Sequence, residues 1–289
     1  MLKQKIAHSI KILKFAEEFA NAQNYKLILA YSGGKDSDVL LDLAKLAGIK
    51  FEAVFNNTTV ENSVTCRYIR SKNDNITWKN PRKNFYQICK HKKALPSIFR
   101  RFCCKGLKER KVKKSVTLFG IRKDESANRA KFWNEFSDKK KKQLPFADFQ
   151  KLLEEKCKSK SVYFNPIFQW SDDDIWNYIR ENNLTINPIY KTQSRCGCWL
   201  CPFASASQKL EVVRANPSVL KPLIELIDHL IAERAPIAAY LPDFYDILEW
   251  YFTQTPIKEF AESRKNPMFE IKSELQQIIE DNNLRSKAL

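Results

Sequence analysis

A loop of small and polar residues constrains the fold of this chain more than any other feature. Residues 26–31 form a short apolar run typical of a buried strand, and residues 38–47 carry apolar side chains at helical spacing. Between these two segments lies Ser32-Gly33-Gly34-Lys35-Asp36-Ser37. A strand, a tight loop and a helix in this order predict the first crossover of a parallel sheet.

The alternation of strand-like and helix-like segments continues along the chain. The predicted strands cover residues 51–55, 76–78, 116–119 and 162–164, and the predicted helices cover 2–22, 62–72 and about 171–182. Ser171 is the expected N-cap of the last of these helices, with Asp174 as its acidic partner. We therefore predict an α/β fold with a doubly wound, mostly parallel sheet over residues 1–204, followed by a helical region over residues 205–289.

The composition of the loop predicts a site for anions. Small residues at a strand-to-helix turn let main-chain N–H groups converge on an anion, and the N-terminal end of the helix dipole adds to the attraction. Gly33 and Gly34 leave room for this approach. Lys35 adds a fixed positive charge, and Ser32 and Ser37 add hydroxyl donors. The spacing is neither that of a Walker loop nor that of a dinucleotide-binding loop.

The segment Tyr31-Ser-Gly-Gly-Lys-Asp-Ser37 resembles the PP-loop of the adenine nucleotide α-hydrolase superfamily. Within it, the chain is similar to the phosphoadenosine phosphosulfate (PAPS) reductase family, which includes DndC-like DNA sulfur-modification proteins. The resemblance covers residues 26 to about 204 and includes Phe55–Glu61 with Thr65 and Tyr68, Gly120–Arg122 with Glu125, Ser126 and Arg129, Trp170–Trp176, Asn187-Pro188, Tyr190, and Arg195–Cys198. Asn57 stands where the family pattern usually has Asp.

The resemblance implies that the loop residues 32–37 bind an adenine nucleotide, with Arg122 and Arg129 close to it. Guanidinium groups keep their charge and match phosphate or sulfate oxygens, although ion pairs with the neighbouring acidic residues at 124 and 125 are the alternative. We expect catalytic roles for Lys35 and Asp36. Asp36 either holds Mg²⁺ brought by a triphosphate or caps the following helix.

Four of the eight cysteines form a candidate metal site, namely the tandem Cys103-Cys104 and the pair Cys198-x-x-Cys201. A single zinc ion would require adjacent residues to direct both sulfurs at one atom, whereas a cubane cluster offers separate iron corners. We therefore predict a [4Fe-4S] cluster, as the resemblance also implies. Cys196 is either a substitute ligand or a sulfur-carrying thiol. The other three, Cys66, Cys89 and Cys157, are expected to be small buried side chains.

The net charge of the chain indicates which kinds of partner it can attract. The formal net charge is +17, with much of the excess in residues 100–114 and in the lysine run 139–142, which we expect in an exposed loop. Such a chain attracts polyanions, although a solvated lysine-rich surface gives the same composition. No apolar run approaches the roughly 20 residues that span a bilayer. We expect a cytoplasmic protein that binds no membrane and whose cysteines are not disulfide-bonded.

The position of the last cysteine separates two enzymatic hypotheses. Reductases of the similar family use a nucleophilic cysteine in a mobile C-terminal segment, whereas no cysteine follows Cys201 here. The first hypothesis is therefore ATP-dependent adenylation of DNA or tRNA followed by sulfur transfer, with the cluster and a partner cysteine desulfurase as the sulfur source. The alternatives are a reductase of PAPS or adenylyl sulfate, and a non-catalytic nucleic-acid-binding module on the same fold.

Overall fold

The chain forms two compact units, each made of several separate segments. The computed structural model describes residues 2–72, 74–109, 112, 114–138, 143–146, 161–263 and 270–285. The first unit contains Met1–Asn56, Ser63–Lys79 and Lys111–Cys196, and the second contains Asn57–Asn62, Asn80–Arg110 and Gly197–Leu289. The lysine run at 139–142 and Cys157 lie outside the described residues. The predicted domain boundary at residue 204 remains a prediction.

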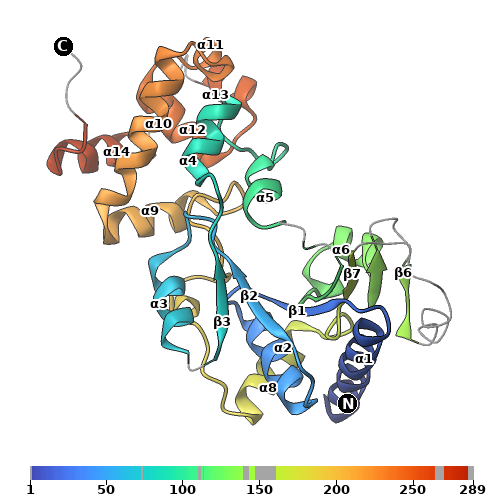
Figure 1. The fold of residues 1–289 in the computed structure, drawn as a ribbon. Helices are drawn as coiled ribbons and strands as arrows, with labels where there is room; N and C mark the ends of the chain where they lie inside the picture. The colour runs from blue at the N-terminus through green and yellow to red at the C-terminus, as the bar shows by residue number, and fades with distance from the viewer. Residues whose placement is uncertain are drawn as a thin grey trace. The chain divides into compact units, whose positions relative to one another are not determined.

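The first unit is built on a seven-stranded sheet, counted in the described residues, with the order β3-β2-β1-β4-β7-β5-β6 (Figure 1). The strands are β1 (Lys26–Tyr31), β2 (Glu52–Asn56), β3 (Ile76–Lys79), β4 (Ser115–Leu118), β5 (Phe136–Asp138), β6 (Gln143–Leu144) and β7 (Ser161–Phe164). β1, β2, β3, β4 and β7 pair in parallel, and β5 and β6 add an antiparallel edge. The predicted mostly parallel α/β fold is confirmed, whereas the antiparallel edge was not predicted.

The helical segments of the first unit are α1 (Leu2–Ala22), α2 (Lys35–Leu46), α3 (Ser63–Ser71), η1 (Lys123–Glu125), α6 (Ala127–Phe132), α8 (Asp172–Glu181) and η3 (Pro188–Lys191). Four of these helices, α1, α2, α3 and α8, lie close to the predicted positions, whereas the short segments η1, α6 and η3 were not predicted. Ser171 and Asp174 form the predicted capping box of α8. Helix α2 begins three residues earlier than predicted, so Lys35 and Asp36 lie in its first turn.

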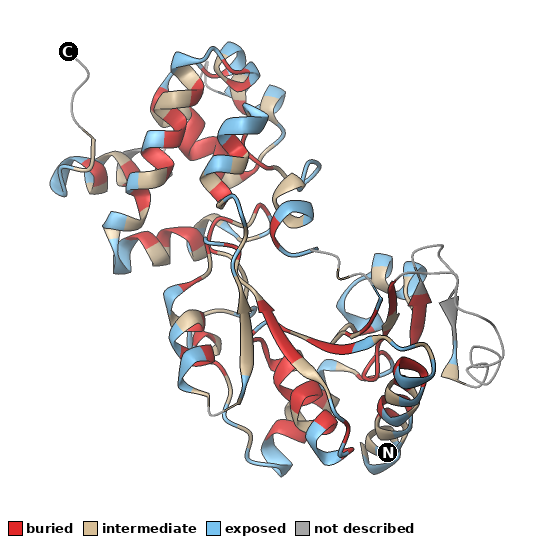
Figure 2. Cartoon of the chain, in the orientation of Figure 1, coloured by how far each residue is buried: buried red, intermediate tan, exposed pale blue. Residues whose placement is uncertain are grey.

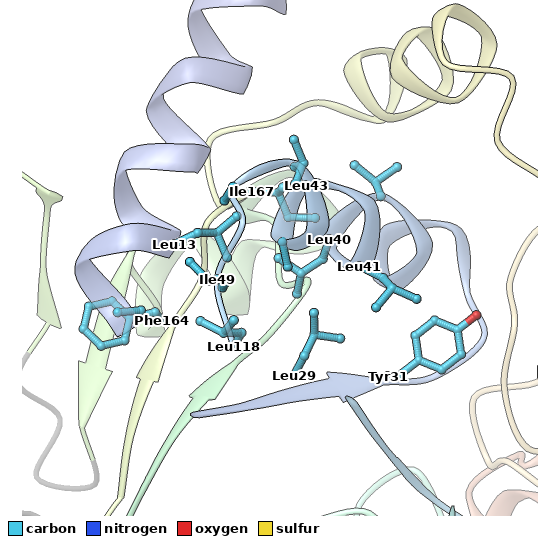
Figure 3. Packing of buried hydrophobic residues seen from close by; sticks show 14 of the residues in the cluster. Leu13, Leu29, Tyr31, Leu40, Leu41, Leu43, Ile49, Leu118, Phe164 and Ile167 are labelled. Carbon is cyan, nitrogen blue, oxygen red and sulfur yellow. The ribbon is translucent and has the colours of Figure 1, made fainter. Parts of the chain in front are cut away.

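The main core of the first unit lies where helices cover one face of the sheet (Figure 3). Leu13 of α1 and Leu40 of α2 pack over this face, toward strand residues such as Leu29 of β1, and all three are fully buried. Alternate residues of a strand point to opposite faces, and Ile28 and Val54 on the other face are buried too. A strand that is buried on both faces explains why residues 26–31 read as a continuous apolar run.

The second unit is helical in the described residues. Its helices are α4 (Phe85–Lys92), α5 (Phe102–Leu107), α9 (Ala206–Ala215), η4 (Pro217–Leu220), α10 (Lys221–Ala232), α11 (Pro236–Tyr240), α12 (Phe244–Thr253), α13 (Ile257–Ser263) and α14 (Glu270–Asp281). Figure 2 shows their buried inner faces in red. The predicted helical C-terminal region is confirmed, whereas α4 and α5 were not predicted. None of the described helices is long and apolar enough to cross a membrane.

Lys209 of α9 is an unusual member of the second unit's core, since its side chain is 0% exposed. Its ammonium group donates to the carbonyl oxygens of Tyr251 and Phe252 at 3.2 and 2.9 Å. These carbonyls belong to the last turn of α12, where helical carbonyl groups need partners from outside the helix. Burial lowers the pKa of Lys209 to about 8.

The lowered pKa of Lys209 predicts a pH-dependent contribution to stability. Between pH values of about 8 and 10.5, the unfolded chain keeps a proton on this lysine that the folded chain has lost. Because protons then bind preferentially to the unfolded state, the free energy of unfolding gains a term that rises with pH in this window. We expect the difference in unfolding free energy between the wild type and Lys209→Met, measured by urea denaturation, to rise from pH 8 to pH 10. Parallel pH profiles would contradict the assignment.

Candidate functional site

The glycine loop lies at the point where the strand order of the first unit reverses. β1 is flanked by β2 on one side and by β4 on the other, so the loops that follow β1 and β4 leave the same end of the sheet side by side. Ligands of open α/β sheets bind at such a switch point. A Cβ atom at Gly120, which follows β4, would lie 3.1 Å from the backbone oxygen of Asp36. Glycine at this position lets the two loops approach closely.

The loop itself is held in one conformation by its own residues and by Asn187. Gly33 has a φ of +73°, and a Cβ atom there would lie 2.9 Å from the Ile69 side chain. The Asn187 amide group, which is fully buried, donates to the Gly33 carbonyl at 2.9 Å and to the Thr65 hydroxyl at 3.0 Å. Glycine is therefore required at residue 33, and a side chain from far along the sequence fixes the turn.

Three main-chain amides of the loop are directed at hydroxyl groups. Ser32 N–H donates to Ser37 Oγ at 3.3 Å, Gly34 N–H donates to Ser32 Oγ at 3.3 Å, and Lys35 N–H donates to Tyr190 Oη at 3.0 Å. A charged phosphate oxygen is a stronger acceptor than a neutral hydroxyl group. These amides can therefore exchange a hydroxyl partner for an anion at the beginning of α2.

Four charged side chains meet beside the loop. Lys35 Nζ lies 2.6 Å from Asp172 Oδ1 and 3.5 Å from Asp36 Oδ2. Arg122 Nε lies 2.6 Å from Asp36 Oδ1, and Arg122 Nη2 lies 2.8 Å from Asp172 Oδ1. Burial alone would raise the pKa of Asp172, but the hydrogen bond and charge of Lys35 outweigh it and hold this pKa below its ordinary value. The two positive groups are therefore neutralised by two carboxylates in the structure.

The contacts of Asp36 contradict its predicted role as the cap of α2, because its carboxylate binds Arg122 instead. Asp36 does not cap α2, because the N-cap is Gly34 and no side chain makes the capping hydrogen bond. Its carboxylate instead binds Arg122, which is only 3% exposed. The Nη1 atom of Arg122 is buried without a hydrogen-bond partner in the described residues, although Asp124 Oδ2 lies 3.7 Å from it. A guanidinium donor without a hydrogen bond beside the glycine loop indicates a place for an additional oxygen acceptor.

The second predicted arginine has a different environment. Arg129 pairs with Glu125, four residues earlier in the chain, which is the ion pair that the sequence allowed as the alternative. Its electrostatic interactions also reach Asp36, Arg122 and Arg195, and burial lowers its pKa. The charge of Arg129 therefore interacts with the charged residues of the site, although the Glu125 carboxylate neutralises it.

A buried network beneath the loop, centred on Asp38 of α2, was missed at the sequence level. Its carboxylate lies 2.6 Å from Tyr31 Oη, 2.9 Å from Tyr68 Oη and 2.8 Å from Lys72 Nζ. Burial raises the pKa of Asp38, although Lys72 and the two hydroxyl groups lower it. The network ties the end of β1 to α2 and α3, and the resemblance had singled out two of its members, Tyr31 and Tyr68, without their link to Asp38.

Cys196 lies directly against the glycine loop. Its sulfur is 3.4 Å from Thr65 Oγ1, 3.7 Å from Asn187 Nδ2 and 3.8 Å from the Ser32 carbonyl oxygen. A Cβ atom at Gly34 would lie 3.5 Å from that of Cys196. Of the two interpretations that the sequence allowed, this placement favours a thiol that acts at the nucleotide loop over a substitute cluster ligand.

The predicted metal-binding cysteines all belong to the second unit. The thiol of Cys103 hydrogen-bonds to that of Cys104 and interacts electrostatically with Cys198. The hydrogen bond from Cys103 lowers the pKa of Cys104, and burial raises that of Cys198 to about 12. In the described part of the chain, no three His, Cys, Asp or Glu side chains are arranged to hold a single metal ion.

One positive side chain interacts with three of the four cysteines. The charge of Lys108 interacts first with Cys198, then with Glu61, Cys201 and Cys104, and these groups raise its pKa. Cys198 also lies 3.2 Å from Thr58 Oγ1. Three thiols around one ammonium group, with Cys103 beside Cys104, suit a negatively charged iron–sulfur cluster, whose cysteine ligands end at separate iron atoms and so stand further apart than the ligands of one ion.

The comparisons with known proteins identify the class to which this fold and site belong. A parallel sheet with a glycine loop at its switch point is the arrangement of the PP-loop nucleotide-binding proteins. Residues 26–204 match the phosphoadenosine phosphosulfate reductase domain, and the chain belongs to this family. The sequence resemblance to the family is thereby confirmed.

Individual relatives are distant. Uncharacterized protein MJ0973 of Methanocaldococcus jannaschii is 28% identical over 230 residues, which cover 76% of this chain and 52% of that protein. Sulfate adenylyltransferase subunit 2 of Psychromonas ingrahamii is 29% identical over 67% of this chain and 68% of that protein. The structure of PAPS reductase from Candida auris is 16% identical and covers 61% of this chain and 82% of that chain, with a TM-score of 0.42. The chain spans about half the length of the first of these relatives.

The paired charges beside the loop predict the effect of one substitution on anion binding. Asp172→Asn removes the carboxylate that neutralises both Lys35 and Arg122, whereas Asp173→Asn removes the same charge from the exposed neighbouring residue. We expect Asp172→Asn to bind inorganic pyrophosphate about tenfold more tightly than the wild type by isothermal titration calorimetry, which corresponds to about 1.4 kcal/mol. Equal affinities of the two variants would show that Asp172 does not compete with the anion.

Proposed function

We propose that this protein binds ATP at the glycine loop and transfers the adenylyl group to an oxygen of a nucleic acid. A sulfur nucleophile then forms a C–S bond at the activated carbon, the C–O bond breaks, and the oxygen leaves as part of AMP. The observation that carries the proposal is the convergence of loop amides, Lys35 and Arg122 at the beginning of α2. The relative named sulfate adenylyltransferase subunit 2 supports adenylyl transfer as a reaction of this family.

The chemistry of adenylation fits the residues of the site. An acceptor oxygen forms a bond to the α-phosphorus of ATP, the bond between that phosphorus and the bridging oxygen breaks, and pyrophosphate leaves with the electron pair. Lys35 and Arg122 neutralise the charge that develops on the leaving pyrophosphate. Asp36 and Asp172 carry the carboxylate oxygens that Mg²⁺ prefers, so they are the groups that would meet the metal of Mg-ATP.

The second unit supplies the sulfur chemistry in this proposal. Cys103, Cys104, Cys198 and Cys201 would hold a [4Fe-4S] cluster, and the Lys108 ammonium fits beside it by balancing its negative charge. When bound through three of these four cysteines, such a cluster would leave its fourth iron open for a sulfur atom. A cysteine desulfurase is the kind of partner that would deliver this sulfur. The net charge of +17 supports DNA or tRNA as the acceptor.

A sulfonucleotide reductase is the second candidate, and the position of Cys196 favours it. A thiolate at the loop would attack the sulfur of PAPS or adenylyl sulfate, so that an S–S bond forms, an S–O bond breaks and the adenosine phosphate leaves. The product is an S-sulfocysteine, from which a dithiol reductant would release sulfite. The absence of a cysteine after residue 201 does not disfavour this reaction as strongly as the sequence alone suggested, since Cys196 is at the loop.

Parallel incubations with ATP and with PAPS distinguish the two reactions. We expect pyrophosphate release from ATP in the presence of RNA or DNA, and we expect Lys35→Ala to reduce the rate at least 100-fold because charge neutralisation at the leaving group is lost. Cys196→Ser serves as the control, since it removes the nucleophile of the reductase reaction alone. Sulfite release from PAPS that is abolished in Cys196→Ser, with no pyrophosphate from ATP, would overturn the proposal in favour of the reductase.

A further inference from the structure

A tight turn of the second unit places two large apolar side chains in solvent. Ser97 and Arg100 exchange two backbone hydrogen bonds, of 3.3 and 3.1 Å, which close the turn. The residues at its tip are Ile98, which is 38% exposed, and Phe99, which is 86% exposed. Turn tips usually carry glycine, asparagine, aspartate or serine, because apolar side chains gain nothing from water. An exposed phenylalanine at such a tip indicates a surface that contacts a partner.

A second turn presents another exposed aromatic ring. The turn is closed by the Ala204 N–H group, which donates to the Cys201 carbonyl at 2.9 Å, and it carries Phe203, which is 45% exposed. The guanidinium carbon of Arg101 lies 5.1 Å from the centre of the Phe203 ring. This stacking joins the two turns, although they are about one hundred residues apart in the sequence.

The charge around these rings is positive. Arg100, Arg101 and Lys105 are exposed, and the only acidic residue among the described residues 97–109 is Glu109. We call this set the aromatic–basic surface and define it as Ile98, Phe99, Arg100, Arg101, Lys105 and Phe203. Exposed aromatic rings between exposed cations match the chemistry of unpaired bases on a phosphate backbone. An acidic apolar patch of a protein partner would bind the positive side chains, but its recognition does not require flat, separated aromatic rings.

We propose that the aromatic–basic surface binds a single-stranded segment of nucleic acid, with bases stacked on Phe99 and Phe203 and phosphates bound by the neighbouring cations. The inference rests on the proposed function in one respect, which is that the acceptor is a nucleic acid. The surface is part of the same two segments that carry the cysteines, since Cys103 follows Phe99 by four residues and Phe203 follows Cys201 by two. A strand bound there lies beside the predicted cluster ligands.

Fluorescence anisotropy with a labelled strand tests this surface. The probes are a single strand of about 12 nucleotides, within the usual site size, as RNA and as DNA, and the corresponding duplexes. We expect a single strand to bind more tightly than its duplex. Phe99→Ala and Phe203→Ala should each weaken that binding by about 5- to 100-fold, as loss of base stacking does. Arg101→Gln should also reduce the dependence of affinity on salt.

Two control variants separate stacking from general damage. Phe99→Trp keeps a stacking ring and should retain the affinity, and Tyr240→Ala removes an aromatic ring that is 50% exposed on α11 and should leave it unchanged. Because Phe99 is 86% exposed, its replacement should also leave the melting temperature unchanged. Binding of the RNA or the DNA probe identifies the kind of acceptor.

The inference is overturned if Phe99→Ala and Phe203→Ala bind single strands as tightly as the wild type, or if duplexes bind as well as single strands. Strand binding is measured without ATP, so the result is independent of adenylation. Strand binding through Phe99 without any pyrophosphate release would contradict the proposed function alone. Pyrophosphate release with no contribution of Phe99 or Phe203 to strand binding would contradict the surface alone.

Discussion

The left-handed turn at Gly33 is the constraint on which the rest of the site depends. The chain must pass from the buried strand β1 into α2 within three residues, and Gly33 does so with a φ of +73° against the Ile69 side chain. Asn187 holds this turn from a distant part of the sequence by donating to the Gly33 carbonyl. A buried amide that is fully paired fixes its partners, because loss of either hydrogen bond would leave a buried polar group unsatisfied. The direction of the loop amides, and the positions of Lys35 and Asp36 after them, follow from this turn.

The second property of the site is the pairing of its positive side chains with carboxylates of the same chain. Lys35 and Arg122 share Asp172, and Arg122 also binds Asp36, so the four charges sum to zero. In the proposed function, a nucleotide phosphate competes with Asp172 for these cations, whereas Asp36 can keep its contact with Arg122. The side chain of Asp172 is about half exposed, so breaking its ion pairs costs only a screened electrostatic attraction, which water partly replaces. The two positive groups of the site are therefore paired with a carboxylate that can be exchanged for an anion under the proposed function.

The sequence predicted those parts of the structure that depend on local patterns. The run 26–31, the loop and the helix after it were predictable because burial on both faces, glycine and helical spacing leave clear signals in neighbouring residues. Asp172 was not predictable, since its role arises from a salt bridge with residues 137 and 50 positions earlier in the chain. Cys196 stayed ambiguous for the same reason: its neighbours Thr65, Asn187 and Ser32 meet it only in the fold. The helices α4 and α5 were missed because they are short and lie in a strongly basic stretch.

Selective labelling of the glycines measures the central claim directly, because the chain contains only six of them. In a spectrum of the protein labelled with ¹⁵N-glycine, titration with Mg-ATP should shift the amide signals of Gly33 and Gly34 in a saturable manner. Gly48, which follows the far end of α2, should not shift. If ATP binds while the signals of Gly33 and Gly34 stay in place, the glycine loop does not hold the phosphates, and the nucleotide site lies elsewhere on the protein.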